Sequence, residues 1–136
     1  MDDLLLKTPI PYEVKRPNRW LITFDAPYDK IAGFALSKSS RPKLINSKWS
    51  DIEIILRDPI APSTTEGIMN GLRKNKKKKK PISYSLEMLG PVGDVVEKWL
   101  ISGYIKEVDF GDLDYSDDCL IMIKLVISVD NVVLEF

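Results

Sequence analysis

The sequence has no histidine, and Cys119 is its single cysteine among 136 residues. Without histidine there is no Ser-His-Asp or Cys-His catalysis, no histidine-ligated metal site and no use of the commonest general base. One cysteine excludes an internal disulfide and a cysteine-rich metal site. We therefore expect no catalytic residue, no cofactor and no metal, and a protein that is not an enzyme.

The chain also lacks net charge and a long apolar run. Lys plus Arg total 20 and Asp plus Glu total 20, whereas a dedicated nucleic-acid binder usually has a basic excess. The most apolar stretch, residues 120–129, contains Lys124 and is far shorter than the roughly 20 residues that span a bilayer. Asp2 and Asp3 stand where a signal peptide needs positive charge. We expect no membrane partner, synthesis in the cytoplasm, and a reduced Cys119.

What is present fits one globular domain, with 44% hydrophobic residues. Residues 1–19 contain Pro9, Pro11 and Pro17 and little periodicity, which predicts an extended N-terminal arm. Residues 20–136 are expected to form a single β-sandwich domain. Charge is uneven within it: residues 71–80 carry seven basic residues and no acid, and residues 81–136 carry three basic residues and eleven acids.

Alternating apolar and polar residues predict strands over 20–24, 31–39, 50–57, 83–89, 95–102, 104–110 and 119–130. Gly103 is expected to break or bulge the chain between the fifth and sixth of these. The strand over 119–130 is predicted to be the longest, with Cys119 acting as a small buried hydrophobe at its start. Residues 42–47 are expected to form a loop. The fold class is mainly β, an antiparallel sandwich or barrel with one flanking α-helix.

The helix is predicted over about residues 64–75. Ser63 and Glu66 have the spacing of a capping box at its start. Ile68, Met69 and Leu72 form a narrow apolar stripe, and Pro81 prevents the helix from continuing far beyond the lysines that follow.

A basic patch at the end of this helix is the strongest charge feature. It could contact phosphate or an acidic protein surface, or be a solvated loop between helix and strand. No aromatic residues alternate with the lysines, which disfavours a stacking platform for single-stranded nucleic acid. The patch comprises Arg73, Lys74, Lys76, Lys77, Lys78, Lys79 and Lys80.

Five aspartates surround Gly111: Asp109, Asp112, Asp114, Asp117 and Asp118. Their spacing does not match a calcium-binding loop, which needs a bidentate Glu beyond its glycine. An acidic turn between strands is the preferred interpretation.

Apolar residues are in surplus for a domain of this size. The strand over 119–129 is apolar on both faces, which one small domain cannot easily cover. Either the helix and arm cover the second face, or another copy of the chain does, and ring closure would also protect open sheet edges. The subunit-interface candidates are Trp49, Trp99, Tyr104, Phe110, Leu113 and Tyr115.

Three segments resemble the tail tube proteins of contractile-tailed bacteriophages and the effector-tube proteins of type VI secretion. The first is RPNRWLITF at residues 16–24, and the second is WSDIEI at residues 49–54, followed by a short helix. The most specific is GDVVEKWLISG at residues 93–103, followed by VDFGDLDYS at residues 108–116 and a final apolar strand.

The resemblance implies a β-sandwich or barrel subunit that closes into a homohexameric ring with a continuous inner β-barrel. Rings would stack into a tube that delivers the genome inside a contractile sheath. The implied partners are further copies of the chain, the sheath, the tape-measure protein, and baseplate and tail-terminator proteins, with DNA only in transit. A baseplate adaptor, a tail initiator or an effector tube of a related injection system is the alternative. The implied location is the tail tube of the virion.

Two placements follow from this resemblance. The arm and residues 41–48 are expected to contact neighbouring subunits or the next ring. The lysine run is expected on the outside of the tube, because positive charges in the channel would hold the phosphates of passing DNA.

Overall fold

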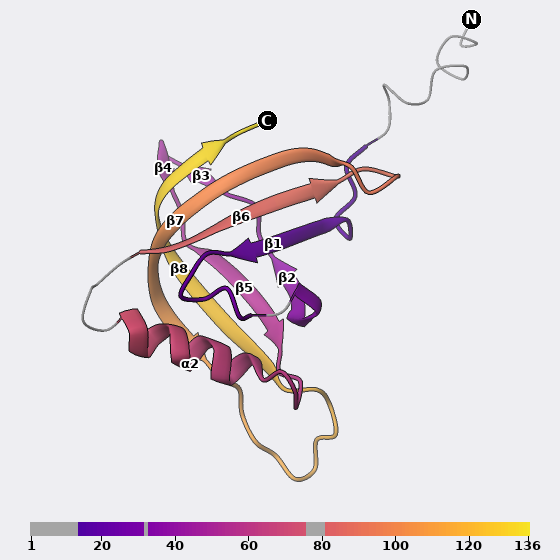
Figure 1. The fold of residues 1–136 in the computed structure, drawn as a ribbon, viewed down its shortest axis with the longest axis vertical. Helices are drawn as coiled ribbons and strands as arrows, with labels where there is room; N and C mark the ends of the chain where they lie inside the picture. Colours follow the sequence, from indigo (N-terminus) through magenta and orange to yellow (C-terminus); the bar gives the residue numbers. More distant parts are fainter. Residues whose placement is uncertain (1–13, 32, 76–80) are drawn as a thin grey trace, which may run out of the picture.

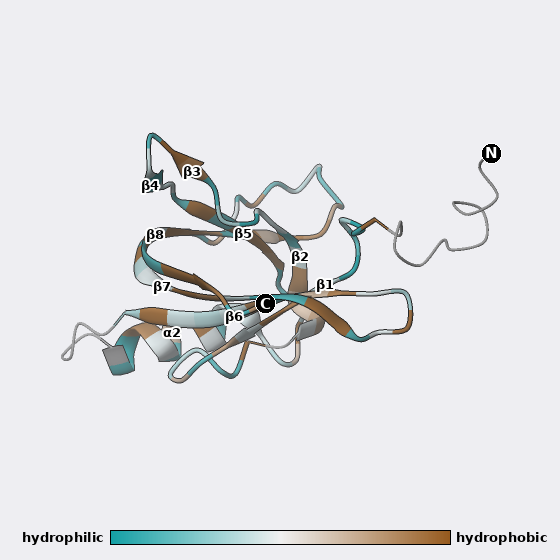
Figure 2. Ribbon diagram, turned by 90° about the horizontal axis from the view of Figure 1, so that it is seen from above, coloured by the Kyte–Doolittle hydropathy of each residue, from teal (hydrophilic) through white to brown (hydrophobic). Residues whose placement is uncertain are grey.

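The computed structural model describes residues 14–31, 33–75 and 81–136. Strands make up 47% of the structure, and one α-helix is present among the described residues. Six strands form one antiparallel sheet in the order β1-β6-β7-β8-β5-β2. The sheet curls until it is nearly closed into a barrel, with β5 on one side and β6 and β1 on the other (Figure 2). The predicted fold class is confirmed.

The elements follow the predicted order with corrected bounds. The six strands of the curled sheet are β1 (Trp20–Phe24), β2 (Leu36–Ser39), β5 (Ile52–Arg57), β6 (Ile82–Leu89), β7 (Val95–Asp109) and β8 (Met122–Leu134). A separate hairpin consists of β3 (Leu44–Ile45) and β4 (Lys48–Trp49), whereas residues 42–47 were expected to be a loop. Its turn residues Asn46 and Ser47 both have positive φ angles, as tight hairpin turns require.

The prediction of a strand over residues 31–39 is wrong for its first residues. A short 3-10 helix, η2 (Gly33–Ala35), stands there, and only Leu36–Ser39 are strand. Ile31 is buried because it packs toward the helix α2 (Thr64–Asn75) rather than along the sheet: a Cβ on Gly67 would lie 3.5 Å from its side chain.

Two further strand predictions are corrected by β7 and β8. Gly103, which was expected to break or bulge the chain, forms a bulge, and the two strands predicted on either side of it are one continuous 15-residue strand. This makes β7 and not β8 the longest. The neighbouring backbone fills the space beside Gly103, since a Cβ there would lie 2.2 Å from the Ser128 carbonyl oxygen. The last strand begins at Met122 rather than at Cys119, which is exposed in the loop before it. A second bulge follows Ile105, and bulges increase the local twist that curls a sheet.

The helix prediction is confirmed, because α2 spans Thr64–Asn75. The Ser63 hydroxyl accepts a hydrogen bond from the Glu66 amide, 3.2 Å away, which is one half of the expected capping box. The sequence did not reveal the second cap. Asp58 accepts hydrogen bonds from the Thr64 and Thr65 amides and from the Thr65 hydroxyl. Burial alone would raise the pKa of Asp58, but these hydrogen bonds outweigh it and lower the pKa below its usual value.

The core lies between the concave face of the sheet and α2, which crosses the open side of the barrel (Figure 1). Ile52, Ile54 and Leu56 alternate into it from β5 and are fully buried, as the sequence predicted. The aromatic ring of Tyr28 lies directly against Gly71 of α2. The opposite, convex face of the sheet has no helix over it in the part of the chain that the structure describes.

Candidate functional site

One end of the barrel is organised around a buried glutamate. Glu97 of β7 is only 4% exposed. Its carboxylate accepts hydrogen bonds from Lys15 Nζ at 2.5 Å, from Arg41 Nη2 at 2.6 Å and Nε at 3.0 Å, and from Trp99 Nε1 at 2.5 Å. The carboxylate therefore joins the N-terminal segment, the chain before β3, and the middle of the sheet.

These four donors compensate for the burial of the charge. Burial alone would raise the pKa of Glu97, but the hydrogen bonds from Lys15, Trp99 and Arg41 and the charge of Arg41 lower it below its usual value. The carboxylate is thus held ionised at neutral pH. A buried carboxylate that is paired with cations and accepts four hydrogen bonds holds its partners in defined positions.

An unpartnered apolar surface lies beside this glutamate. The rings of Trp49 and Trp99 meet edge to face with centroids 6.4 Å apart. Leu44 pairs with Trp49 across the β3–β4 hairpin, and Leu134 pairs with Trp99 between β8 and β7. The outer members of this chain of contacts are exposed: Leu44 by 58%, Ile45 by 49%, Leu134 by 54% and Phe136 by 57%. Exposed apolar residues that gather in this way mark an interaction surface.

Basic residues surround that surface. We call the region made of residues 14–19, 41–49 and 134–136 the hairpin end. Its first two segments contain six basic residues and no acid, and only Lys15 and Arg41 are paired with Glu97. The remaining four basic residues are Arg16, Arg19, Lys43 and Lys48.

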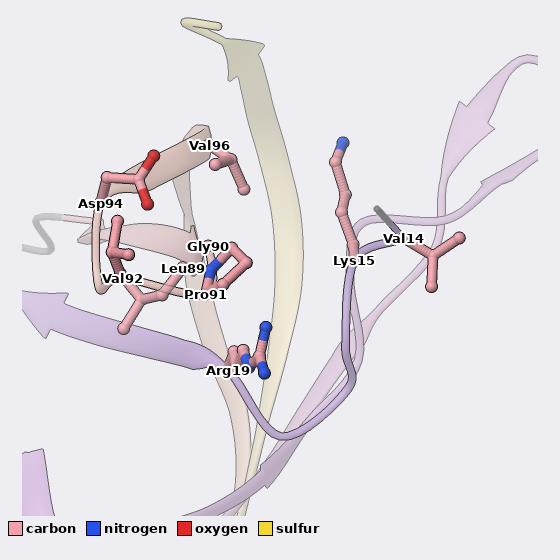
Figure 3. A pocket seen from close by; sticks show the side chains of 9 residues that line it. All are labelled: Val14, Lys15, Arg19, Leu89, Gly90, Pro91, Val92, Asp94 and Val96. Atoms are coloured by element: carbon pink, nitrogen blue, oxygen red, sulfur yellow. The ribbon is translucent and has the colours of Figure 1, made fainter. Parts of the chain in front are cut away.

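A groove of about 470 Å³ adjoins the hairpin end. Val14 and Lys15 of the N-terminal segment lie on one side, and Val92, Asp94 and Val96 of the β6–β7 turn lie on the other (Figure 3). Its side chains are mainly apolar and it carries no cluster of convergent carboxylates. An apolar groove of this kind is typical of a docking surface.

The convex face of the sheet carries rows of polar residues interrupted by exposed apolar ones such as Leu100 and Val133, and we call it the uncovered face. Cross-strand rows place Thr23, Ser85, Leu100 and Val133 side by side, with Ser83, Ser102 and Asn131 in the next row and Tyr104 and Ser128 in the one after. All three lysines of β7 and β8 are paired here. Lys98 lies 3.6 Å from Glu135, Lys106 lies 2.8 Å from Asp51, and Lys124 lies 3.3 Å from Glu107.

The opposite end of the molecule carries the aspartates. We call residues 109–121 the acidic loop; apart from Phe110, which is half-buried, they are all exposed, and they contain five acids and no base. Asp109, Asp114 and Asp117 each accept a hydrogen bond from an amide two residues on, so they shape turns, as expected. Asp117, Asp118 and Cys119 bring potential ligand atoms within 4.8 Å of one another, but these are exposed residues adjacent in a turn, and we assign no metal to them.

The structure separates the interface candidates into three places. Trp49 and Trp99 meet at the hairpin end. Tyr104 lies on the uncovered face, half exposed and opposite Ser128. The others belong to the acidic loop, where Leu113 and Tyr115 are almost fully exposed and Phe110 is half-buried. Of the predicted basic patch, Arg73 and Lys74 are exposed in the last turn of α2; Lys76 to Lys80 lie outside the described residues.

Sequence reasoning missed Glu97 and its cationic partners. A signal for it was present: Glu97, Trp99 and Ile101 share one face of β7, so an acid occupies the inward side of an alternating strand. Lys15 and Arg41 could not be found in this way, because they are 26 residues apart in sequence and lie outside regular elements.

In the described part of the chain, no helix has both the length and the apolar character needed to cross a membrane. No protein-family model matches the sequence, and no curated protein matches it.

Solved structures with the same fold belong to contractile injection systems. A chain of the sheath-tube complex of an extracellular contractile injection system (PVC), in its extended state, is 10% identical with a TM-score of 0.60 and covers 96% of both chains. The tube-terminating cap of the anti-feeding prophage is 10% identical, with a TM-score of 0.64 over 90% of this chain and 91% of that one. A chain of the anti-feeding prophage baseplate is 13% identical, with a TM-score of 0.57 over 90% and 95%. The chain has a tail-tube-like fold, as the sequence resemblance implied.

Proposed function

We propose that this chain is a structural subunit of the tube of a contractile tail or a related contractile injection system, and not an enzyme. Copies would close into a homohexameric ring with a continuous inner β-barrel, and rings would stack into a conduit. The observation that carries the proposal is the uncovered face, a sheet surface on which every lysine of β7 and β8 is paired with a carboxylate.

Such a surface suits the wall of a channel for DNA. Free ammonium groups bind phosphates through counterion release, and a wall that carried them would hold the duplex at each ring. Here nearby carboxylates pair with the lysines of β7 and β8. Serine, threonine and asparagine lie in the rows between them, together with Leu100 and Val133. A neutral to acidic wall leaves the duplex mobile.

Ring closure would also protect the sheet. Strands β1 and β2 are its two edges, since each pairs with only one neighbour. An open edge presents unpaired amides and carbonyls that promote uncontrolled association. A neighbouring subunit on each edge would satisfy them and join the sheets of successive subunits.

The other assignments rest on the family resemblance. The sheath, the tape-measure protein, and baseplate and terminator proteins are the proposed partners, with DNA only in transit. Arg73 and Lys74 are basic and lie in the last turn of α2, and we propose that this basic patch faces outward, toward the sheath. Residues 1–19 are proposed as an arm that reaches a neighbouring subunit.

A cap, terminator or baseplate subunit is the second candidate, because such chains share this fold at similar TM-scores. Negative-stain electron microscopy of the purified protein, with sedimentation velocity, separates the candidates. We expect hexameric rings and tubes of indefinite length. Single rings would favour the cap or adaptor, and a monomer at all concentrations would overturn both.

Thiol labelling tests which face lines the channel. In a Cys119→Ser background, Ser128→Cys places a thiol on the uncovered face and Glu66→Cys places a matched thiol on the exposed side of α2. We expect a bulky polymer maleimide to label both in dissociated subunits, but only the Glu66→Cys variant in assembled tubes. Equal labelling of both thiols in tubes would contradict the proposed wall.

A further inference from the structure

We propose that the acidic loop of one copy docks on the hairpin end of the next, so that the chain stacks head to tail through a contact that is apolar at its centre and charged around it. This inference rests on the proposed tube function and names the surfaces that would connect successive rings.

The two surfaces lie at opposite ends of the molecule. The β3–β4 hairpin and the C-terminus occupy one end, and the loop between β7 and β8 occupies the other (Figure 1). Because the surfaces are different and point in opposite directions, a contact between them is heterologous. Heterologous contacts that do not close on themselves produce open-ended assemblies, as a stack of rings requires.

Each surface carries exposed apolar side chains that no described residue covers. At the hairpin end these include Leu44, which pairs with Trp49, and Leu134, which pairs with Trp99, together with Ile45 on the other face of the hairpin. In the acidic loop, Leu113 is 88% exposed and Leu120 is 73% exposed. The loop also borders a hollow of about 390 Å³. Isolated surface leucines are ordinary, but two gathered sets suggest mutual burial.

The charges around the two surfaces are opposite and closely balanced. The loop has five acids and no base, whereas residues 14–19 and 41–49 have six basic residues, two of which already pair with Glu97. Complementary charge of this kind orients two subunits as they meet and suppresses wrong contacts. Here the wrong contacts would be between two hairpin ends or between two acidic loops. The occupant of each surface is therefore a second copy of this chain.

Charge-swap variants test the contact. Among the described residues, Asp112 and Asp118 accept none of the hydrogen bonds that shape the loop, and Lys43 and Lys48 make no ion pair. The loop variant carries Asp112→Lys and Asp118→Lys, and the hairpin variant carries Lys43→Glu and Lys48→Glu. A control variant carries Lys30→Glu, the same type of substitution at an exposed position that belongs to neither surface.

The readout is tube length in electron micrographs together with sedimentation velocity. We expect the loop and hairpin variants to form rings but at least tenfold fewer stacks, the control to form normal tubes, and the variant with all four changes to recover stacking. Wild-type stacks should shorten as salt rises, because such charges are screened beyond about 8 Å at physiological ionic strength.

Two outcomes separate this inference from the tube function. If the wild type forms tubes and both charge variants form them equally well, the docking contact is wrong and the tube function stands. If the wild type forms rings that never stack, the docking contact is wrong and the cap or adaptor function is favoured. Loss of stacking in both single-surface variants without recovery in the combined variant would also overturn the pairing of these two surfaces.

Discussion

Replacing Gly71 by alanine should destabilise the protein, although alanine is the better helix former. Gly71 lies in the interior of α2, where Gly→Ala ordinarily gains about 1 kcal/mol. A Cβ at this position would lie 2.3 Å from Tyr28 Cδ1 and 2.4 Å from Cε1. Tyr28 is only 1% exposed, so its ring has little room to move away.

Gly67 in the same helix provides the matched control. A Cβ there would meet the Ile31 side chain at 3.5 Å, which is an ordinary van der Waals distance. The helix-propensity gain is common to both variants, so their difference isolates the clash with Tyr28. Overpacking of a core costs about 1–3 kcal/mol, and we expect Gly71→Ala to be less stable than Gly67→Ala by that amount.

Urea unfolding followed by tryptophan fluorescence measures the difference, at a protein concentration below that at which assemblies form. The double variant Tyr28→Leu, Gly71→Ala should show coupling, with Gly71→Ala costing less once the ring is gone. A Gly71→Ala protein as stable as Gly67→Ala would refute the close packing of α2 on Tyr28.

Three other predictions concern buried groups. Glu97→Gln should cost about 2 kcal/mol, because its charged donors are half-exposed and can partly re-solvate. The pKa of folded Glu97 is below its ordinary value of 4.5, so its carboxylate stabilises the fold fully above about pH 5 and loses this contribution as pH falls through the folded pKa. The difference in urea midpoint between wild type and variant should therefore become smaller in acid. A difference that stays constant with pH would contradict this. Tyr84→Phe should gain about 1 kcal/mol, because the Tyr84 hydroxyl is buried without a hydrogen-bond partner among the described residues, and a loss in thermal unfolding would argue against it. Gly103→Ala should lower the free energy of unfolding by more than about 3 kcal/mol and expose β7–β8 amides to hydrogen exchange, since its Cβ would meet a backbone oxygen. Ser102→Ala is the control. Equal protection of these amides from exchange in both variants would count against the bulge.

Local patterns in the sequence were sufficient for most elements. The alternation of Ile52, Ile54 and Leu56 predicted a strand and its buried face, and both are present. The cap at Ser63 located the start of the helix correctly. These features depend on interactions between residues that are close in sequence, so the sequence alone is enough to predict them.

Boundaries failed where distant residues decide them. The local sequence at Gly103 predicted a break or a bulge without deciding between them. Pairing with β6 on one side and β8 on the other keeps β7 continuous through a bulge. Cys119 appeared to begin a strand because it precedes an apolar run. It lies instead in an exposed loop, where the aspartates bind neighbouring amides and hold the backbone in turns.

Composition and short-range periodicity were sufficient to predict the fold class, the helix over residues 64–75, the core face of the strands and the uneven distribution of charge. Folding alone brings Lys15, Arg41 and Trp99 together on Glu97. It also pairs the three lysines of β7 and β8 with carboxylates and places the basic and acidic segments at opposite ends. These features depend on the order and curl of the strands. That order brings together residues far apart in the chain, and no local pattern in the sequence encodes it.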